Sequence, residues 1–121
     1  MGRRLNLTEL SSYDVLPDEI LKNVKVIKMP RISKTFTGIT LGKYIFLSKK
    51  LEYDGKSLLI AHELVHVRQW HELGVIGFLW KYLSEFFKGL IKEKNWMKAY
   101  NKISLEQEAQ LIANLWQERK R

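Results

Sequence analysis

The first half of the chain carries short apolar runs that predict strands. Segment 24–29 (Val-Lys-Val-Ile-Lys-Met) alternates apolar and basic residues up to Pro30, which predicts one strand. A second β-rich stretch runs from Thr35 to Ser48, where Gly42 is placed to turn one strand into the next. Four apolar residues of this stretch share one parity and are expected to face a core together: Ile39, Leu41, Ile45 and Leu47.

After Asp54 the apolar spacing becomes helical. Asp54 or Ser57 can cap a helix that runs through Trp70. A second helical stretch is expected from about Gly74 to Lys92. Its apolar stripe is formed by six residues: Ile76, Leu79, Leu83, Phe86, Phe87 and Leu90.

A third helix is expected near the C-terminus, where Ser104 and Gln107 have the spacing of a capping box. A short helix is also predicted over 17–22, where Pro17 stands in a first-turn position with acidic residues behind it. Strands therefore come first and helices later. This order predicts a single α+β domain over 1–121, with a small mixed or antiparallel sheet of about three strands packed on two of the helices.

Composition and charge restrict what such a domain can bind. The 121 residues include no cysteine, which excludes disulfides and thiolate metal sites. The net charge is +8, but the basic residues are scattered and no nucleic-acid-binding motif is found, so no specific nucleic-acid partner is expected. The N-terminus does not resemble a signal peptide, and the longest apolar run, 73–80, is short for a membrane span. A cytoplasmic location is therefore expected.

The sequence 62–66 (His-Glu-Leu-Val-His) lies within the first predicted long helix. Residues four apart on a helix are separated by about 6 Å along the axis and about 40° around it, so His62 and His66 point the same way and can bind one metal ion. Glu63 is rotated away from them, from where it can act as general base on a metal-bound water. The chain has only three histidines, so chance rarely produces this pattern.

A catalytic zinc ion usually takes three protein ligands, so a further ligand is needed. His71 lies five residues after His66, which does not return it to the same helix face, and we interpret it as an ordinary residue at the helix end. The C-terminal helix offers Glu106 and Glu108. Glu106 shares a face with two alanines that would allow close helix packing and is preferred, but periodicity leaves Glu108 open.

The two helix motifs resemble those of gluzincin zinc metallopeptidases. Ala61–His66, followed by 106–110 (Glu-Gln-Glu-Ala-Gln), is similar to the two-His helix and the downstream glutamate helix of minigluzincins and of the peptidase cores of HtpX-like and CAAX-prenyl proteases. The resemblance covers roughly 24–116 and implies one zinc ion held by both histidines and Glu106. Gln110 stands where the family's Glu-x-x-Ala-Asp motif has its Asp.

The same resemblance implies an endopeptidase. In such enzymes the zinc ion acidifies a water, which implies that Glu63 takes the water's proton, and the substrate backbone binds along an exposed edge strand, here near Phe36–Leu41. These peptidases commonly supply a further donor to the developing oxyanion. Tyr100 is the candidate, because of its place before Glu106.

A latent or non-catalytic zinc-binding domain is the main alternative, docking on a protein partner or a membrane surface. Segment 74–92 interleaves aromatic residues with lysines, and such a helix can make peripheral contact with an anionic bilayer. It can also close the core or cover the cleft of the site. Glu63 favours the catalytic interpretation, because a structural zinc site has no need of a base.

Overall fold

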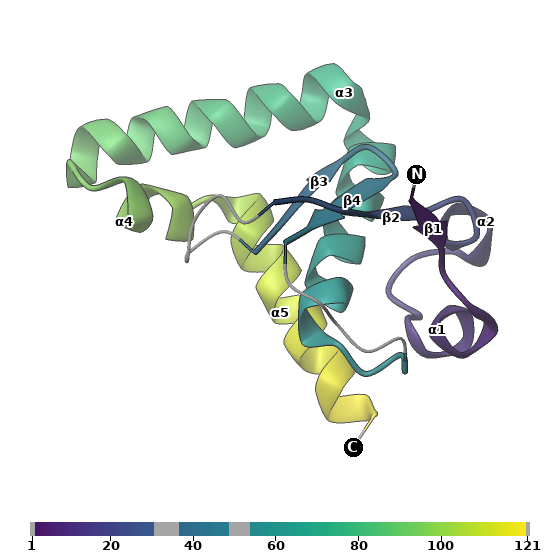
Figure 1. The fold of residues 1–121 in the computed structure, drawn as a ribbon. Coiled ribbons are helices and arrows are strands. Elements are labelled where there is room, and N and C mark those ends of the chain that lie inside the picture. Colours follow the sequence, from purple (N-terminus) through teal and green to yellow (C-terminus); the bar gives the residue numbers. More distant parts are fainter. Residues whose placement is uncertain (1, 31–36, 49–53, 121) are drawn as a thin grey trace.

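Four short strands form one mixed sheet in the computed structural model, which describes residues 2–30, 37–48 and 54–120 (Figure 1). The strands are β1 (Arg3–Arg4), β2 (Lys25–Lys28), β3 (Gly38–Leu41) and β4 (Tyr44–Leu47), in the order β1-β2-β4-β3. β2 and β4 are parallel, and the other neighbours are antiparallel. The predicted α+β class is confirmed, with one strand more than expected. β1 was missed because two residues carry no detectable alternation.

Five helices lie around this sheet in the described residues: α1 (Leu7–Ser12), α2 (Asp18–Leu21), α3 (Leu58–Glu93), α4 (Trp96–Asn101) and α5 (Ser104–Arg119). α1 and α4 were not predicted, since six residues are too few for a periodic apolar face. α1 does carry a signal that could have revealed it. Asn6 and Glu9 form a reciprocal capping box at its start, and Arg3 holds the buried Glu9 carboxylate at 2.7 Å.

The hairpin of β3 and β4 inverts the predicted inward face of β3. Ile45 and Leu47 are buried, as expected, whereas Ile39 and Leu41 are exposed and Thr40 is buried instead. The reason is the two-residue turn, which pairs Thr40 with Ile45. Paired residues share a face, so a two-residue turn gives the two strands opposite parity. Thr35 and Phe36 of the predicted β-rich stretch lie outside the described residues.

Gly74 divides α3 into two helical halves that run in different directions (Figure 1). Its φ of 75° and ψ of 169° belong to a region that only glycine adopts without strain. The first half, capped by Ser57, packs between the sheet and α5, while the second half lies along α4. The predicted break between two helices at this glycine is thereby confirmed.

Replacing Gly74 with alanine should destabilise the fold by about 1–3 kcal/mol. The structure leaves open space where the new Cβ would lie, so backbone strain alone accounts for the loss. Gly77→Ala is the matched control, because its Cβ would make only an ordinary 3.5 Å contact inside a regular helix and should stabilise by up to about 1 kcal/mol. Urea unfolding measures both, and equal effects would contradict the proposed strain.

The start of α5 is fixed by a residue of α3. The predicted capping box of Ser104 and Gln107 is wrong, because Ile103 occupies the N-cap position and Ser104 is already helical. Glu85 of α3 accepts hydrogen bonds from both the backbone N–H and the hydroxyl of Ser104, each at 2.8 Å. The Glu85 carboxylate therefore caps the N-terminus of α5 and links α5 to the second half of α3.

Two apolar clusters support these helices. The larger lies among the sheet, α1, α2, the first half of α3 and α5, and it includes Leu21, Ile45, Leu64 and Trp116. The smaller one, formed by Trp70, Phe78, Ile103 and Leu105, lies where the two halves of α3 and the start of α5 meet. Over the described ranges, no helix has the length and apolar character needed to cross a bilayer.

Candidate metal centre

The two imidazoles of the first half of α3 converge as the helical spacing predicts. The Nε2 atoms of His62 and His66 lie 3.2 Å apart, and the rings meet edge to face. His66 is buried, and His62 is half-buried. Leu64 and Val65, on the buried side of the same helix, pack in the core and hold the helix in place.

Glu106 of α5 brings a third atom that could hold a metal ion close to the two imidazoles. Its Oε1 lies 3.1 Å from the Nε2 atom of each histidine, so the three atoms form a nearly equilateral triangle. Ala109 and Ala113 are fully buried on the same side of α5, and their small side chains let α5 approach α3 closely. Donor atoms on a tetrahedral zinc ion are about 3.3 Å apart, given bond lengths of about 2.0–2.1 Å. The residues present therefore fit a divalent ion.

The charges of the cluster also favour a cation at its centre. Burial opposes ionisation of Glu106, but hydrogen bonds with His62 and His66 outweigh it and hold the pKa of this carboxyl far below its usual range. Burial likewise opposes a charged His66, yet the carboxylate of Glu106 raises the pKa of this imidazole. A proton on one imidazole neutralises the Glu106 carboxylate but leaves the other imidazole without a positive partner. A divalent ion can bind all three atoms at once.

Gln69 fixes the orientation and tautomer of His66. The Gln69 amide nitrogen donates to the backbone carbonyl of Leu105 at 3.0 Å and to the Glu108 carboxylate at 2.8 Å. Its amide oxygen must then face the Nδ1 atom of His66, 2.7 Å away. Nδ1 is therefore the donor, and a neutral His66 directs the lone pair of Nε2 toward His62 and Glu106, as a metal ligand must. No sequence pattern indicated this role for Gln69.

The placement of Glu108 follows from the same contacts. This residue was the open alternative for the third ligand, but its carboxylate binds Gln69 and its side chain is exposed. Glu106 is the acid of α5 that contacts both imidazoles. His71 is exposed at the far end of the first half of α3 and lies in a separate hollow beside α2, which agrees with its interpretation as an ordinary residue.

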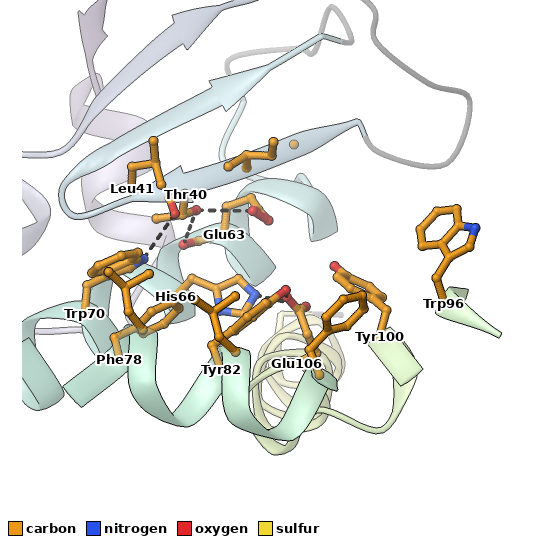
Figure 2. Close-up of a pocket in the computed structure, with 15 residues that line it drawn as sticks. Thr40, Leu41, Glu63, His66, Trp70, Phe78, Tyr82, Trp96, Tyr100 and Glu106 are labelled. Carbon is orange, nitrogen blue, oxygen red and sulfur yellow. Dashed lines mark hydrogen bonds and ion pairs between the residues drawn. The ribbon is translucent and has the colours of Figure 1, made fainter. Parts of the chain in front are cut away.

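Glu63 lies beside the ligand triangle, between α3 and β3. Its ligand atom is within 4.8 Å of those of the two histidines, and its side chain is only 4% exposed. The hydroxyl of Thr40 is 3.2 Å from the Glu63 carboxylate and 3.2 Å from its backbone carbonyl (Figure 2). Burial raises the pKa of Glu63, with the two imidazoles opposing the shift. A buried carboxylate with a raised pKa is suited to accept a proton.

Strand β3 is held closely against Glu63. The indole N–H of Trp70 donates to the backbone carbonyl of Thr40 at 3.1 Å. A Cβ atom at Gly38 would lie 3.4 Å from the Glu63 carboxyl carbon and 3.0 Å from the side chain of Leu47, so glycine permits the close approach. The role of Thr40 was not predicted, because the parity of the apolar residues indicated the opposite face of β3 as the buried one.

Tyr82, on the second half of α3, positions the third ligand. Its hydroxyl donates to Oε2 of Glu106 at 2.6 Å, which leaves Oε1 facing the histidines (Figure 2). Burial, followed by the charge of Glu106, raises the pKa of Tyr82 well above its ordinary value, so the hydroxyl keeps its proton. In the sequence Tyr82 is one of several aromatic residues of segment 74–92, and nothing there distinguishes it from core aromatic residues.

If the three atoms of this triangle hold a zinc ion, Tyr82→Phe should weaken its binding by about 10–100-fold, the usual effect of removing a hydrogen bond to a ligand. The stacking of ring 82 on Phe78 is retained, so the fold should persist. Competition with a zinc indicator measures the affinity. Tyr44→Phe, on an exposed tyrosine of β4, is the control and should bind zinc as the wild type does. Equal affinity of both variants would remove Tyr82 from the site.

An apolar cavity of about 380 Å³ opens beside Glu63, His66 and Glu106. Trp70, Phe78 and Leu79 of α3 form one side of it, and β3 forms the other. Tyr100 of α4 also lines the cavity, and it lies beside Glu106 in Figure 2. Burial and the charge of Glu106 raise the pKa of Tyr100, which keeps it a hydrogen-bond donor. Its suggested role at an oxyanion stays a prediction.

The structure therefore brings together every residue that the sequence suggested for the site: His62, Glu63, His66, Tyr100 and Glu106. His62, Glu63 and His66 form a group able to hold a metal ion. Comparisons of the chain with protein-family models, curated proteins and solved structures found no match.

Proposed function

We propose that this protein is a zinc-dependent endopeptidase of the gluzincin type. The observation that carries the proposal is the triangle of His62, His66 and Glu106 ligand atoms, with a separate buried carboxylate beside it. Glu63 is not needed to complete that triangle. A structural metal site uses its nearby acids as ligands, whereas a hydrolytic site also needs a base.

Each residue of the site has its own role in the proposed hydrolysis. A bound zinc ion supplies Lewis-acid activation of a water molecule and of the scissile carbonyl. Glu63 takes the proton of the attacking water and can return it to the leaving amine. Thr40 holds the Glu63 carboxylate in place, and the wall of aromatic side chains excludes bulk water from the site.

An extended peptide is the substrate that this site suits. β3 lies at one edge of the sheet that the described residues form, and it borders the cavity, so a peptide can add to it as a further strand. The bordering residues are Gly38–Leu41 of the expected segment, and Phe36 lies outside the described residues. The cavity is lined by Leu41, Trp70 and Phe78, which suit a large apolar side chain next to the scissile bond.

Removal of metal should abolish hydrolysis and lower the free energy of unfolding. The purified chain is expected to carry about one zinc ion, to cleave an unfolded protein, and to lose this activity after chelation. Adding zinc back should restore it, and zinc at 100 times its Kd should stabilise the fold by about 2.7 kcal/mol. Metal analysis, a cleavage assay and thermal melting measure these effects.

Two outcomes would contradict this proposal. A chain without stoichiometric zinc, and without a melting shift when zinc is added, would show that the triangle is not a zinc site. Stoichiometric zinc without cleavage of any peptide in a broad panel would instead support a latent or non-catalytic zinc-binding domain. Glu72→Gln serves as a control for chain integrity, because Glu72 is an exposed residue of the same helix, away from the ligand triangle.

A further inference from the structure

The second half of α3, residues 75–93, exposes a row of large apolar side chains. Three of them expose more than three quarters of their accessible surface: Ile76 (85%), Ile91 (79%) and Trp80 (77%). Seven residues make up this apolar stripe: Val75, Ile76, Leu79, Trp80, Leu83, Phe87 and Ile91. At 100° per residue they fall within an arc of about 160°, so they form one continuous face of the helix.

The apolar stripe adjoins the face that packs on the body of the protein. Phe78, Tyr82 and Phe86 lie on this neighbouring face, where they join the smaller apolar cluster. The expectation that this helix closes the core or covers the cleft holds for the packed face, and the apolar stripe remains exposed beside it. One face of the helix packs on the protein, and the apolar stripe remains exposed over nearly five turns. An exposed apolar face of this length is typical of a binding surface.

Lysines lie beside the apolar stripe. Lys81, Lys88 and Lys92 share the third face of the helix, next to Ile91 and Trp80, and all three are exposed. Lys94 and Lys98 follow at the tip, where α3 gives way to α4. Glu85, the acid nearest to this face, is already bonded to Ser104, and Lys81 is 3.7 Å from it. The helix thus combines exposed tryptophan and aliphatic residues with a basic face, within a chain of net charge +8.

We propose that residues 75–93 bind the surface of an anionic lipid bilayer. The other residues of the apolar stripe lie among the upper parts of the acyl chains, Trp80 lies near the edge of the stripe at the headgroup level, and Lys88 and Lys92 reach the anionic headgroups. A protein groove could accommodate an apolar face, but an anionic surface also explains the lysines on the neighbouring face. This inference goes beyond the peptidase proposal and does not require it.

The docked orientation has a consequence for the cavity. Leu79 and Leu83 belong to the apolar stripe and also line the cavity beside Glu63, and the exposed Ile39 and Leu41 stand across it on β3. A bilayer beneath the stripe would therefore lie at the mouth of the cavity. Apolar segments at the bilayer surface would have direct access to the site.

Vesicle co-sedimentation tests the proposal without any cleavage assay. The full chain is expected to bind vesicles of phosphatidylglycerol and phosphatidylcholine, to bind phosphatidylcholine alone much more weakly, and to dissociate as salt is raised. Ile76→Glu with Trp80→Glu should reduce binding more than about tenfold. Lys88→Gln with Lys92→Gln should reduce it about 25-fold, from about fivefold for each lysine.

The control is Leu111→Glu, which places one glutamate at an exposed leucine of α5, outside the stripe. This variant should bind vesicles as the wild type does, and circular dichroism should show all variants folded. Absence of binding to anionic vesicles at low salt would overturn the proposal. So would a wild-type dimer that Ile76→Glu with Trp80→Glu makes monomeric and that does not bind vesicles, because the stripe would then contact a second copy.

Discussion

Glu63→Gln should lower peptide hydrolysis by about 10²–10⁴-fold and leave zinc binding unchanged. Glutamine has the shape of glutamate but cannot take the proton of the attacking water. The amide oxygen can still accept from the hydroxyl of Thr40, so the side chain should keep its place. The ligand triangle of His62, His66 and Glu106 does not include residue 63, which is why the metal should stay.

The measurement combines kcat on a quenched fluorescent peptide with zinc content by elemental analysis. Glu72→Gln is the matched control, because it makes the same change to an exposed glutamate nine residues along the same helix. It should keep both zinc and activity. Full activity in Glu63→Gln would remove Glu63 from the mechanism. Loss of zinc in the same variant would mean that Glu63 is a ligand, and the division between ligands and base would be wrong.

Local helix periodicity was enough to predict that the two histidines of this site lie together. The direction of two side chains four residues apart depends only on helix geometry, so His62 and His66 could be placed without knowledge of the fold. The break at Gly74 was equally local. Glu106 is 40 residues from His66 and 44 from His62, and the small residues on its helix face were the local signal for close helix packing.

The residues that support the ligands could not be predicted in this way. Tyr82 and Thr40 act through contacts between elements, and Gln69 is oriented toward His66 by its contacts with α5. The types of these three residues are ordinary for a helix or a strand. Thr40 was hidden further by the two-residue turn, which reversed the parity between β3 and β4. The cap of α5 came from Glu85, 19 residues upstream, so a local capping rule assigned it to the wrong residue.

A comparison of Glu106→Ala with Glu108→Ala should distinguish a residue that binds the metal ion from one that only orients a ligand. Loss of Glu106 removes one of three ligand atoms and should weaken zinc binding by more than about 100-fold, the upper range for residues that only orient a ligand. Glu108 contacts zinc only through Gln69 and His66, and Gln69 keeps its bond to the carbonyl of Leu105. Glu108→Ala should therefore weaken binding by about tenfold at most.

Thermal melting with and without zinc gives a second readout of the same comparison. A ligand that binds only the folded chain raises its stability in proportion to the logarithm of its concentration over Kd. The melting temperature of wild type and Glu108→Ala should therefore rise with added zinc, and that of Glu106→Ala should barely change. Both variants lie on α5 and delete the same atoms, so helix propensity contributes equally. If Glu108→Ala lost the zinc response while Glu106→Ala kept it, the carboxylate near His62 and His66 would not be the ligand.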